Sequence, residues 1–356
     1  MIRDSGEGLA ILAVHLPTSD KRRHCPQFLQ NMSDIHLITG VAGFVGRCLT
    51  ERLLNEGAFV AGFDNLSRGT LRNMAAFRDS PRFLFQETEL TDLDAYRAAF
   101  NHAMEWCPEG RIVVWHLAAN SDIQAGVRDP SVDLRDTFLT TFHTLAMMQE
   151  RKLTKIVFAS TSAIYGPLTG PLHEDAGPLF PISNYGAMKL ASEASISAAA
   201  ESFLTHAWIC RFPNVIGAFA THGVIFDFLN KLRRTPEELE VLGDGNQCKP
   251  YLLVDELVDA MLFITANSGD RLNYFNIGPP DEGVTVRAIA EAVVQVAAPG
   301  AAIRYTGGDR GWVGDVPRFN YSIAKLQKLG WHPRSSSEQA VKAAVQALWN
   351  DPECRQ

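Results

Sequence analysis

Short apolar runs alternate with longer segments of helical periodicity through the first two-thirds of the chain. The apolar runs have the length of buried strands and cover residues 35–38, 59–63, 82–85, 112–117, 155–160 and 207–212. Segments of helix-forming pattern cover residues 47–55, 93–106, 132–150 and 185–204. Strands that alternate with helices are typical of a parallel sheet covered on both faces. The pattern therefore predicts an α/β fold with a doubly wound, Rossmann-type sheet.

A glycine-rich turn joins the first apolar run to the first helical segment. Gly40, Gly43 and Gly46 fall at every third position, and Asp64 ends the second apolar run. A strand, a glycine turn, a helix and an acid after the next strand form the dinucleotide-binding layout. In it Gly40 permits the tight turn, Gly43 leaves room for a pyrophosphate, and Gly46 lets helix and strand pack closely. Asp64 would accept a hydrogen bond from a ribose 2′-hydroxyl and repel a 2′-phosphate, so we predict NAD rather than NADP.

The two ends of the chain differ from the central pattern. Beyond residue 215 the apolar runs shorten and Gly and Pro become frequent, which predicts a smaller mixed α/β lobe. Residues 1–31 lack the basic start and small-residue cleavage site of a signal peptide. We expect a disordered extension at 1–31, an NAD-binding Rossmann domain at 32–205, and a substrate-binding lobe at 206–350 that interleaves with the first domain.

Composition excludes several classes of function. The chain of 356 residues has a net charge of −7, which argues against a nucleic-acid-binding surface. No apolar stretch approaches the roughly 20 residues that a membrane span needs. The six cysteines are scattered without metal-ligand spacing, and the histidines share none either. We therefore expect no metal site, no membrane partner, and reduced thiols in a cytoplasmic protein.

Tyr185 and Lys189 are four residues apart in a helical segment, so their side chains project from one face. A nearby ammonium and a nicotinamide cation would both favour the phenolate, so Tyr185 is the predicted base near neutral pH. Hydroxyl residues follow the strand at 155–160, where they would face the cleft at the carboxyl edge of the sheet. We expect Ser160 to cap the local turn.

Together these motifs resemble the extended branch of the short-chain dehydrogenase/reductase family, and within it the nucleotide-sugar epimerases of the UDP-glucose 4-epimerase group. The resemblance spans residues 33–350 and rests on the glycine turn, on Asp64-Asn65-Leu66-Ser67, His116-Leu117-Ala118-Ala119 and Tyr185-Gly186-Ala187-Met188-Lys189, and on the segments at 160–166, 211–217, 249–254 and 311–316. It implies Thr161, Tyr185 and Lys189 as the catalytic set. It implies cofactor contacts from Gly40, Gly43, Phe44, Val45, Gly46, Asp64, Asn65, Glu89, Leu90, Leu117, Ala118, Ala119, Tyr185, Lys189 and Phe212. It implies substrate contacts from Thr161, Asn214, Val224, Lys249 and Arg310.

The chain departs from the family pattern at several positions. Trp312 replaces a phosphate-binding Arg, for which Arg310 is a candidate substitute, and Lys249 replaces another. Thr137 stands where an Asn often supports the active site. Ala163 provides no carboxyl group where dehydratases and decarboxylases of the family carry one, which favours 4-epimerisation.

The resemblance implies an NAD-dependent nucleoside-diphosphate-sugar 4-epimerase, of UDP-glucose/UDP-galactose type, that acts through a transient 4-keto sugar. Helical segments 132–150 and 185–204 would pack a homodimer, by analogy. The alternatives are a UDP-uronate or UDP-N-acetylhexosamine 4-epimerase, a 4,6-dehydratase, a decarboxylase, a 4-keto reductase, or a non-catalytic NAD-binding protein. The sequence leaves open which sugar and which nucleotide base are bound.

Overall fold

The computed structural model describes residues 33–168, 170–308 and 320–351. Its centre is a seven-stranded sheet in the order β12-β7-β5-β4-β1-β2-β3, in which every neighbouring pair is parallel. The strands are β1 (Ser33–Thr39), β2 (Phe59–Asp64), β3 (Phe83–Glu87), β4 (Gly110–His116), β5 (Lys155–Thr161), β7 (His206–Phe212) and β12 (Leu272–Asn276). The predicted doubly wound parallel sheet is confirmed. The predicted extension at 1–31 lies outside the described residues.

The strand β12 was not predicted in this sheet. Its sequence, Leu-Asn-Tyr-Phe-Asn, mixes apolar residues with two asparagines rather than forming a continuous apolar run. It lies at the sheet edge and pairs only with β7, so it does not need the fully apolar character of a central strand. The chain therefore returns to the first sheet after it has begun the second lobe.

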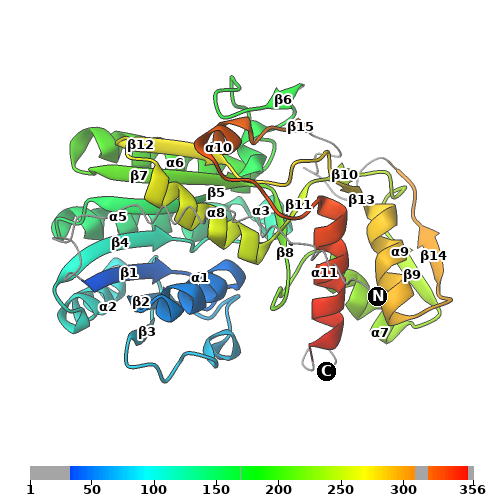
Figure 1. Cartoon of the computed structure of the whole chain (residues 1–356), viewed down its shortest axis with the longest axis horizontal. Coiled ribbons are helices and arrows are strands. Elements are labelled where there is room, and N and C mark those ends of the chain that lie inside the picture. Colours follow the sequence, from blue (N-terminus) through cyan, green and yellow to red (C-terminus); the bar gives the residue numbers. More distant parts are fainter. Residues whose placement is uncertain (1–32, 169, 309–319, 352–356) are drawn as a thin grey trace, which may run out of the picture. The chain divides into compact units, whose positions relative to one another are not determined.

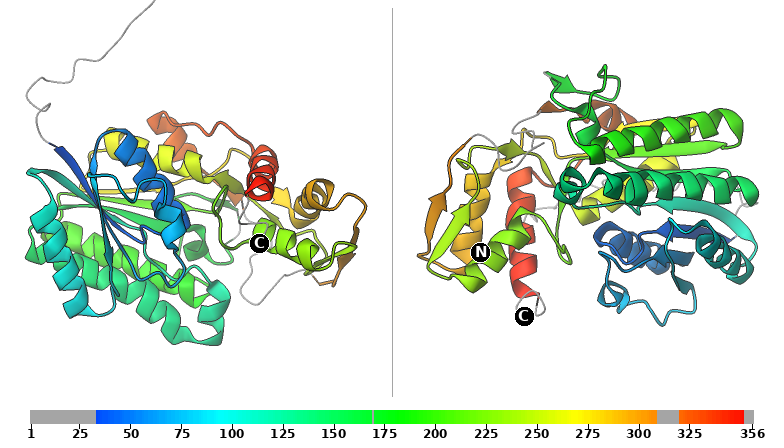
Figure 2. Two further views of the ribbon diagram at one scale, coloured as in Figure 1. Left: turned by 90° about the horizontal axis from the view of Figure 1, so that it is seen from below. Right: turned by 180° about the vertical axis from the view of Figure 1, so that it is seen from behind.

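Helices cover both faces of the sheet (Figure 1). One face carries α1 (Phe44–Asn55) and α8 (Val254–Asn267), and Leu49 and Met261 are buried there. The other face, turned toward the viewer in the right view of Figure 2, carries α5 (Thr140–Glu150) and α6 (Asn184–Ser202), which bury Met148 and Ile196. The helix α2 (Leu93–Trp106) packs into the same core. Burial on both faces explains why the strands read as apolar runs.

The segment predicted as one helix at 132–150 is divided into three. It consists of α4 (Pro130–Asp133), the π-helical turn η3 (Leu134–Leu139) and α5. The Thr137 carbonyl accepts hydrogen bonds from the hydroxyls of Thr140 and Thr141, both at 3.1 Å. These side chains satisfy a carbonyl group in the widened turn, so the helix tolerates the π geometry.

A second lobe follows β7 and has its own core around Leu229, Ile289 and Val345. Its strands pair two by two, β8 with β11, β9 with β14 and β10 with β13. The elements are β8 (Asn214–Ile216), α7 (Val224–Arg234), β9 (Glu238–Val241), β10 (Cys248–Lys249), β11 (Tyr251–Leu253), β13 (Val284–Thr285), α9 (Val286–Ala297), β14 (Ala302–Tyr305) and α11 (Ser337–Asn350). The predicted smaller mixed α/β lobe is confirmed.

Short elements complete the fold. They are η2 (Leu71–Met74), α3 (Ile123–Arg128), η4 (Ser162–Tyr165), β6 (Pro171–Leu172), β15 (Asn320–Tyr321) and α10 (Ala324–Leu329). The strands β6 and β15 pair in parallel over a small apolar cluster that contains Tyr165 and Ile323. Among the helices of the described ranges, none has the length and apolar character of a membrane span.

Candidate active site

A cavity of about 1190 Å³ is lined by residues of both the sheet's carboxyl edge and the second lobe. This is the edge at which open parallel sheets bind ligands. Every predicted site residue that the structure describes lines this cavity: Gly40, Gly43, Phe44, Val45, Gly46, Asp64, Asn65, Glu89, Leu90, Leu117, Ala118, Ala119, Thr161, Tyr185, Lys189, Phe212, Asn214, Val224 and Lys249. Arg310, and with it Trp312, lies outside the described residues.

The glycine turn is compact, and side chains would not fit in it. Gly40 has φ of +73°, and a Cβ there would lie 2.9 Å from the Ala118 amide nitrogen. A Cβ on Gly46 would lie 2.1 Å from the Gly40 carbonyl oxygen, while one on Gly43 would meet the same oxygen at 3.2 Å. Gly46 therefore permits the first turn of α1 to pack against the loop that precedes it. The turn leaves backbone, rather than side chains, at the cavity wall.

The N-terminus of α1 fits a diphosphate. No side chain caps this helix, and Phe44, Val45 and Gly46 in its first turn line the cavity. Unpaired amide N–H groups and the positive end of the helix dipole favour an anion at this position. The structure thus provides the part of an NAD site that the glycine spacing predicted.

Asp64 ends β2 and is almost fully buried, with 7% of its surface exposed. Its carboxylate accepts hydrogen bonds from the Ala42 amide (3.0 Å) and the Leu66 amide (2.8 Å). Burial raises the pKa of this carboxyl group, and the two amide hydrogen bonds oppose that shift. Asp64 therefore fixes the glycine turn as well as lining the cavity, a structural role that sequence reasoning missed.

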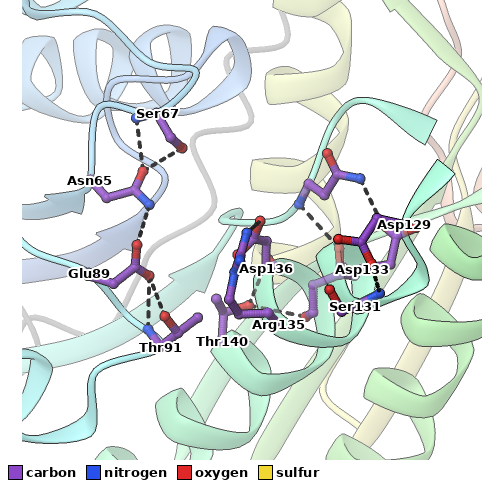
Figure 3. A network of polar contacts seen from close by, with 12 residues as sticks. Asn65, Ser67, Glu89, Thr91, Asp129, Ser131, Asp133, Arg135, Asp136 and Thr140 are labelled. Carbon is purple, nitrogen blue, oxygen red and sulfur yellow. Dashed lines mark hydrogen bonds and ion pairs between the residues drawn. The ribbon is translucent and has the colours of Figure 1, made fainter. Parts of the chain in front are cut away.

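A second polar network borders the same end of the cavity (Figure 3). The Asn65 side chain donates to Glu89 at 2.7 Å, and Glu89 also accepts from the Thr91 amide and hydroxyl. Partial burial opposes ionisation of Glu89, but the hydrogen bonds from Asn65 and Thr91 outweigh it and lower the pKa. Asp136, which pairs with Arg135, lines the cavity as well. A group of carboxylates at this end would repel a 2′-phosphate, so the site suits NAD.

The three predicted catalytic side chains come from two adjacent elements. Thr161 is the last residue of β5, and Tyr185 and Lys189 lie in the first turns of α6. The Thr161 hydroxyl lies near enough to the Tyr185 hydroxyl to lower the pKa of Tyr185. Thr161, and not Ser160 as expected, caps the turn after β5 by accepting from the Ala163 amide at 3.1 Å. The two hydroxyls thus meet at the cavity wall, where a single substrate oxygen can contact both.

Lys189 is buried, and its Nζ lies 5.9 Å from the centre of the Tyr185 ring. Its Nζ donates to the Ala159 carbonyl at 2.7 Å and lies 4.6 Å from the Phe158 ring centre. Burial lowers the pKa of Lys189 to about 7, although the charges of Glu193 and Asp133 raise it. A buried ammonium at this position is therefore only partly protonated near neutral pH.

In the chain without cofactor, the surroundings of Tyr185 oppose its ionisation, so the predicted phenolate depends on the charge of the bound nicotinamide. Burial raises the pKa of Tyr185 to about 12, a shift that the hydrogen bond from Thr161 opposes and the charge of Asp133 reinforces. The spacing correctly placed both residues on one helix face, but spacing carries no information on desolvation. The positive charge of a bound, oxidised nicotinamide would favour the phenolate of Tyr185.

Buried polar residues hold the loop that follows β4. The Thr39 hydroxyl accepts from the amides of Leu117 and Ala118, both at 3.2 Å, and lies 2.7 Å from His116 Nδ1. The other ring nitrogen of His116 lies 3.0 Å from the Thr141 hydroxyl. Burial, together with the charge of Lys189, lowers the pKa of His116 to about 3, so the ring is neutral. Sequence reasoning missed Thr39, because a threonine inside a strand carries no signal of its partners.

A buried ion pair lies beside the end of β5. Arg211 and Glu193 are 8% and 6% exposed and are joined at 2.7 Å, and the Ser160 hydroxyl donates to the same carboxylate. Arg211 also donates to the Tyr165 hydroxyl and to a backbone carbonyl. Sequence reasoning assigned Arg211 to a motif without a role and missed Glu193. The network connects β7 and α6 to the residue that precedes Thr161.

The second lobe contributes a polar helix face to the cavity. Asn214 donates to the Pro250 carbonyl at 3.3 Å, and Val224 opens α7. Among the residues of α7 that line the cavity, the polar and charged ones recur at helical spacing and were not predicted: Asp227, Asn230, Lys231 and Arg234. Their spacing of three and four residues was the available signal. Across the described ranges, His, Cys, Asp and Glu side chains form no group of three that could hold a metal ion.

Comparison with known proteins agrees with this geometry. UDP-glucuronate 4-epimerase of Thermodesulfobacterium geofontis is 27% identical over 87% of this chain and 94% of its own length. A crystal structure of a UDP-galactose 4-epimerase is 31% identical, has a TM-score of 0.76, and is matched over 89% of this chain and 99% of its own. The Thermus thermophilus UDP-glucose 4-epimerase complex with NAD is 26% identical with a TM-score of 0.78, over the same shares of both chains.

A family model matches residues 36–278, which contain the glycine turn, Asp64 and the Thr161–Tyr185–Lys189 set. This chain belongs to the NAD-dependent epimerase/dehydratase family.

Proposed function

We propose that this protein is an NAD-dependent 4-epimerase of nucleoside-diphosphate sugars, of the UDP-glucose/UDP-galactose type, acting through a transient 4-keto sugar. The observation that carries the proposal is the meeting of the Thr161 and Tyr185 hydroxyls in the same cavity as the glycine turn and Asp64. The names of the compared proteins, which act on UDP-glucose, UDP-galactose and UDP-glucuronate, support the substrate class.

Thr161, Tyr185 and Lys189 have different roles in the proposed reaction. When bound, oxidised NAD supplies a reversible hydride acceptor and a positive charge. Tyr185 takes the proton from the sugar 4-hydroxyl at its phenolic oxygen, and returns it when the alcohol re-forms. Thr161 hydrogen-bonds the same sugar oxygen and keeps it against Tyr185. The protonated form of Lys189 would hold the cofactor ribose and stabilise negative charge that develops on Tyr185.

The remaining site residues anchor the nucleotide while the sugar turns over. Asn214, Val224 and Lys249 line the second-lobe side of the cavity, where we place the substrate diphosphate and nucleoside. Lys249 supplies a point charge rather than a bidentate guanidinium, so the diphosphate is held by charge more than by directed hydrogen bonds. The sugar retains the freedom to present either face to the cofactor.

The segment after Thr161 favours epimerisation over elimination or decarboxylation. Ser162 and Ala163 line the cavity beside the reacting hydroxyls, and neither carries a carboxyl group. An elimination needs an acid and a base beyond the Tyr185 hydroxyl. Inversion at C4 uses only the proton and hydride transfers that the existing groups serve.

Product analysis tests the proposal. The full chain is incubated, without added cofactor, with UDP-glucose, UDP-galactose, their uronic acid analogues and their N-acetyl analogues. We expect at least one of them to give a mixture of two C4 epimers of equal mass. A product lighter by water or by carbon dioxide assigns the dehydratase or decarboxylase reaction, and no change in any of them leaves a non-catalytic NAD-binding protein.

The Tyr185→Phe variant tests the assigned base. Removing the phenolic oxygen should lower kcat by about 10²–10⁴-fold, the usual contribution of acid–base catalysis, while bound NAD is retained. Tyr274→Phe is the matched control, because Tyr274 hydrogen-bonds Asp175 outside the cavity. Turnover of Tyr185→Phe equal to that of the control would remove Tyr185 from the mechanism.

We further propose a cytoplasmic homodimer. Leu134 and Phe142 of the η3–α5 segment are 54% and 55% exposed, and a second copy would cover these apolar side chains. Cys48, Cys107 and Cys210 are free thiols in the described part of the chain, as expected in a reducing compartment.

A further inference from the structure

A carboxylate lies buried beneath the first turn of the catalytic helix. Asp133, the last residue of α4, has no exposed surface. One carboxylate oxygen accepts from the Asn120 side chain at 2.8 Å, while the other, Oδ2, has no hydrogen-bond donor within range. Figure 3 shows Asp133 among the polar residues around α4 and the π-helical turn. A buried carboxylate with an unsatisfied oxygen is costly, and the fold retains it beside the active site.

Asp133 is packed against Gly126 of α3. A Cβ added to Gly126 of α3 would lie 1.7 Å from Asp133 Oδ2, so the carboxylate occupies the space that a side chain would fill. The carbonyl of Gly126 in turn accepts from the side chain of Asn184 at 2.8 Å. Asn184 is the first residue of α6 and precedes Tyr185. Asp133 is therefore connected to the catalytic helix through one glycine and one hydrogen bond.

The same carboxylate is hydrogen-bonded to the loop that follows β4. Asn120, which donates to Asp133, also donates to the Asp122 carbonyl at 2.8 Å. The Asn120 amide donates to the Thr137 hydroxyl at 3.2 Å. Thr137, Asn120 and Asp133 thus form one polar cluster at the position where the family pattern places a supporting Asn.

The charges around this cluster define what Asp133 can do. The negative charges of Asp122 and Asp136 raise the pKa of Asp133. The negative charges of Glu193 and Asp133 raise the pKa of Lys189. The charge of Asp133 raises the pKa of Tyr185, and the Thr161 hydroxyl lowers it. Burial raises the pKa of Asp133, and hydrogen bonds from Asn120 and Thr137 oppose the shift. A negative charge at this position favours the protonated form of both Lys189 and Tyr185.

We propose that Asp133 is a positioning residue, a buried counter-charge that keeps Lys189 protonated and sets the basicity of Tyr185. This inference rests on the proposed function for its catalytic meaning. The effect of Asp133 on Lys189 does not depend on that function, because removing the Asp133 charge moves the titration midpoint of Lys189 whether or not a sugar is epimerised. Both groups respond in the same direction: without the carboxylate, each loses its proton at lower pH.

The decisive measurement is the titration of Lys189 in the full chain, followed by NMR with lysine labelled at Cε and assigned with Lys189→Met. Asp133→Asn should lower the Lys189 midpoint by about one pH unit, the size that one nearby charge produces. Asp129→Asn is the matched control: Asp129 is an exposed N-cap four residues earlier, and Asn caps equally well. An unchanged or raised midpoint in Asp133→Asn would overturn the inference.

A reciprocal measurement covers the case in which Asp133→Asn does not fold. Coupling between two sites is mutual, so Lys189→Met should raise the pKa of the Asp133 carboxyl group relative to the otherwise unchanged chain. An unchanged Asp133 titration would again overturn the inference.

The kinetic measurement distinguishes a charge role from a merely structural one. With any sugar nucleotide that the protein epimerises, Asp133→Asn should move the whole pH profile of kcat to lower pH. A lower rate with an unmoved profile would show a structural role and contradict the inference. If the unmodified protein epimerises none of the tested sugars, the proposed function fails, and the Lys189 midpoint alone still decides the role of Asp133.

Discussion

Removing the charge of Arg211 should destabilise the protein far more than removing an exposed arginine. In Arg211→Met the Glu193 carboxylate, 6% exposed, keeps the Ser160 hydroxyl as a hydrogen-bond donor but loses all three contacts with the guanidinium, at 2.7, 3.0 and 3.2 Å. Leaving one partner of a buried pair uncompensated costs about 3–5 kcal/mol. That is a large part of the roughly 5–15 kcal/mol that stabilises a typical domain.

The assay is equilibrium unfolding in urea, compared with Arg304→Met. Arg304 is 52% exposed and pairs with Glu238, which is 44% exposed, at 2.9 Å. An exposed pair of this kind contributes about 0–1 kcal/mol. The double variant Arg211→Met/Glu193→Leu should recover part of the loss, since it removes the stranded charge.

Two results would refute this reasoning. A loss of unfolding free energy in Arg211→Met no larger than that in Arg304→Met would show that the unpaired Glu193 charge carries no burial penalty at this site. A double variant less stable than Arg211→Met by the full cost of a second core substitution would show that Glu193 is not stranded. Because Ser160 precedes Thr161 and bonds Glu193, Arg211→Met should also lower turnover at temperatures where it remains folded.

Three further predictions follow from single features. Gly46→Ala places a Cβ 2.1 Å from the Gly40 carbonyl oxygen, so NAD bound to the purified protein should be lost, and full occupancy would contradict the close-packing argument. Burial lowers the Lys189 pKa from 10.5 to about 7, so the unfolded chain binds more protons between these values and stability rises with pH by up to about 1.4 kcal/mol per unit. Unfolding near pH 7 and near pH 9 should show that Lys189→Met loses this slope. Leu134→Glu with Phe142→Glu should convert the proposed dimer to a monomer in light scattering without loss of helical signal, and an unchanged mass would place the interface elsewhere.

The sequence by itself determined the features that depend on local pattern. Apolar runs predicted six strands of the sheet, because a strand buried on both faces has no position for polar residues. The glycine spacing predicted the turn before α1, because the backbone geometry at Gly40 and Gly46 excludes a Cβ. Tyr185 and Lys189 fell on one helix face, because the helical repeat fixes which side chains are neighbours.

Only the tertiary structure decided the features that depend on contacts between distant segments. The edge strand β12 has no local signal, because it is defined by pairing with β7. The pKa of Tyr185 near 12 follows from desolvation, which depends on everything packed around the hydroxyl. The partners of Asp133, Glu193 and Thr39 are 13 to 77 residues away along the chain. Composition and spacing report which groups a segment carries, whereas burial and charge coupling arise only when the chain brings those groups together.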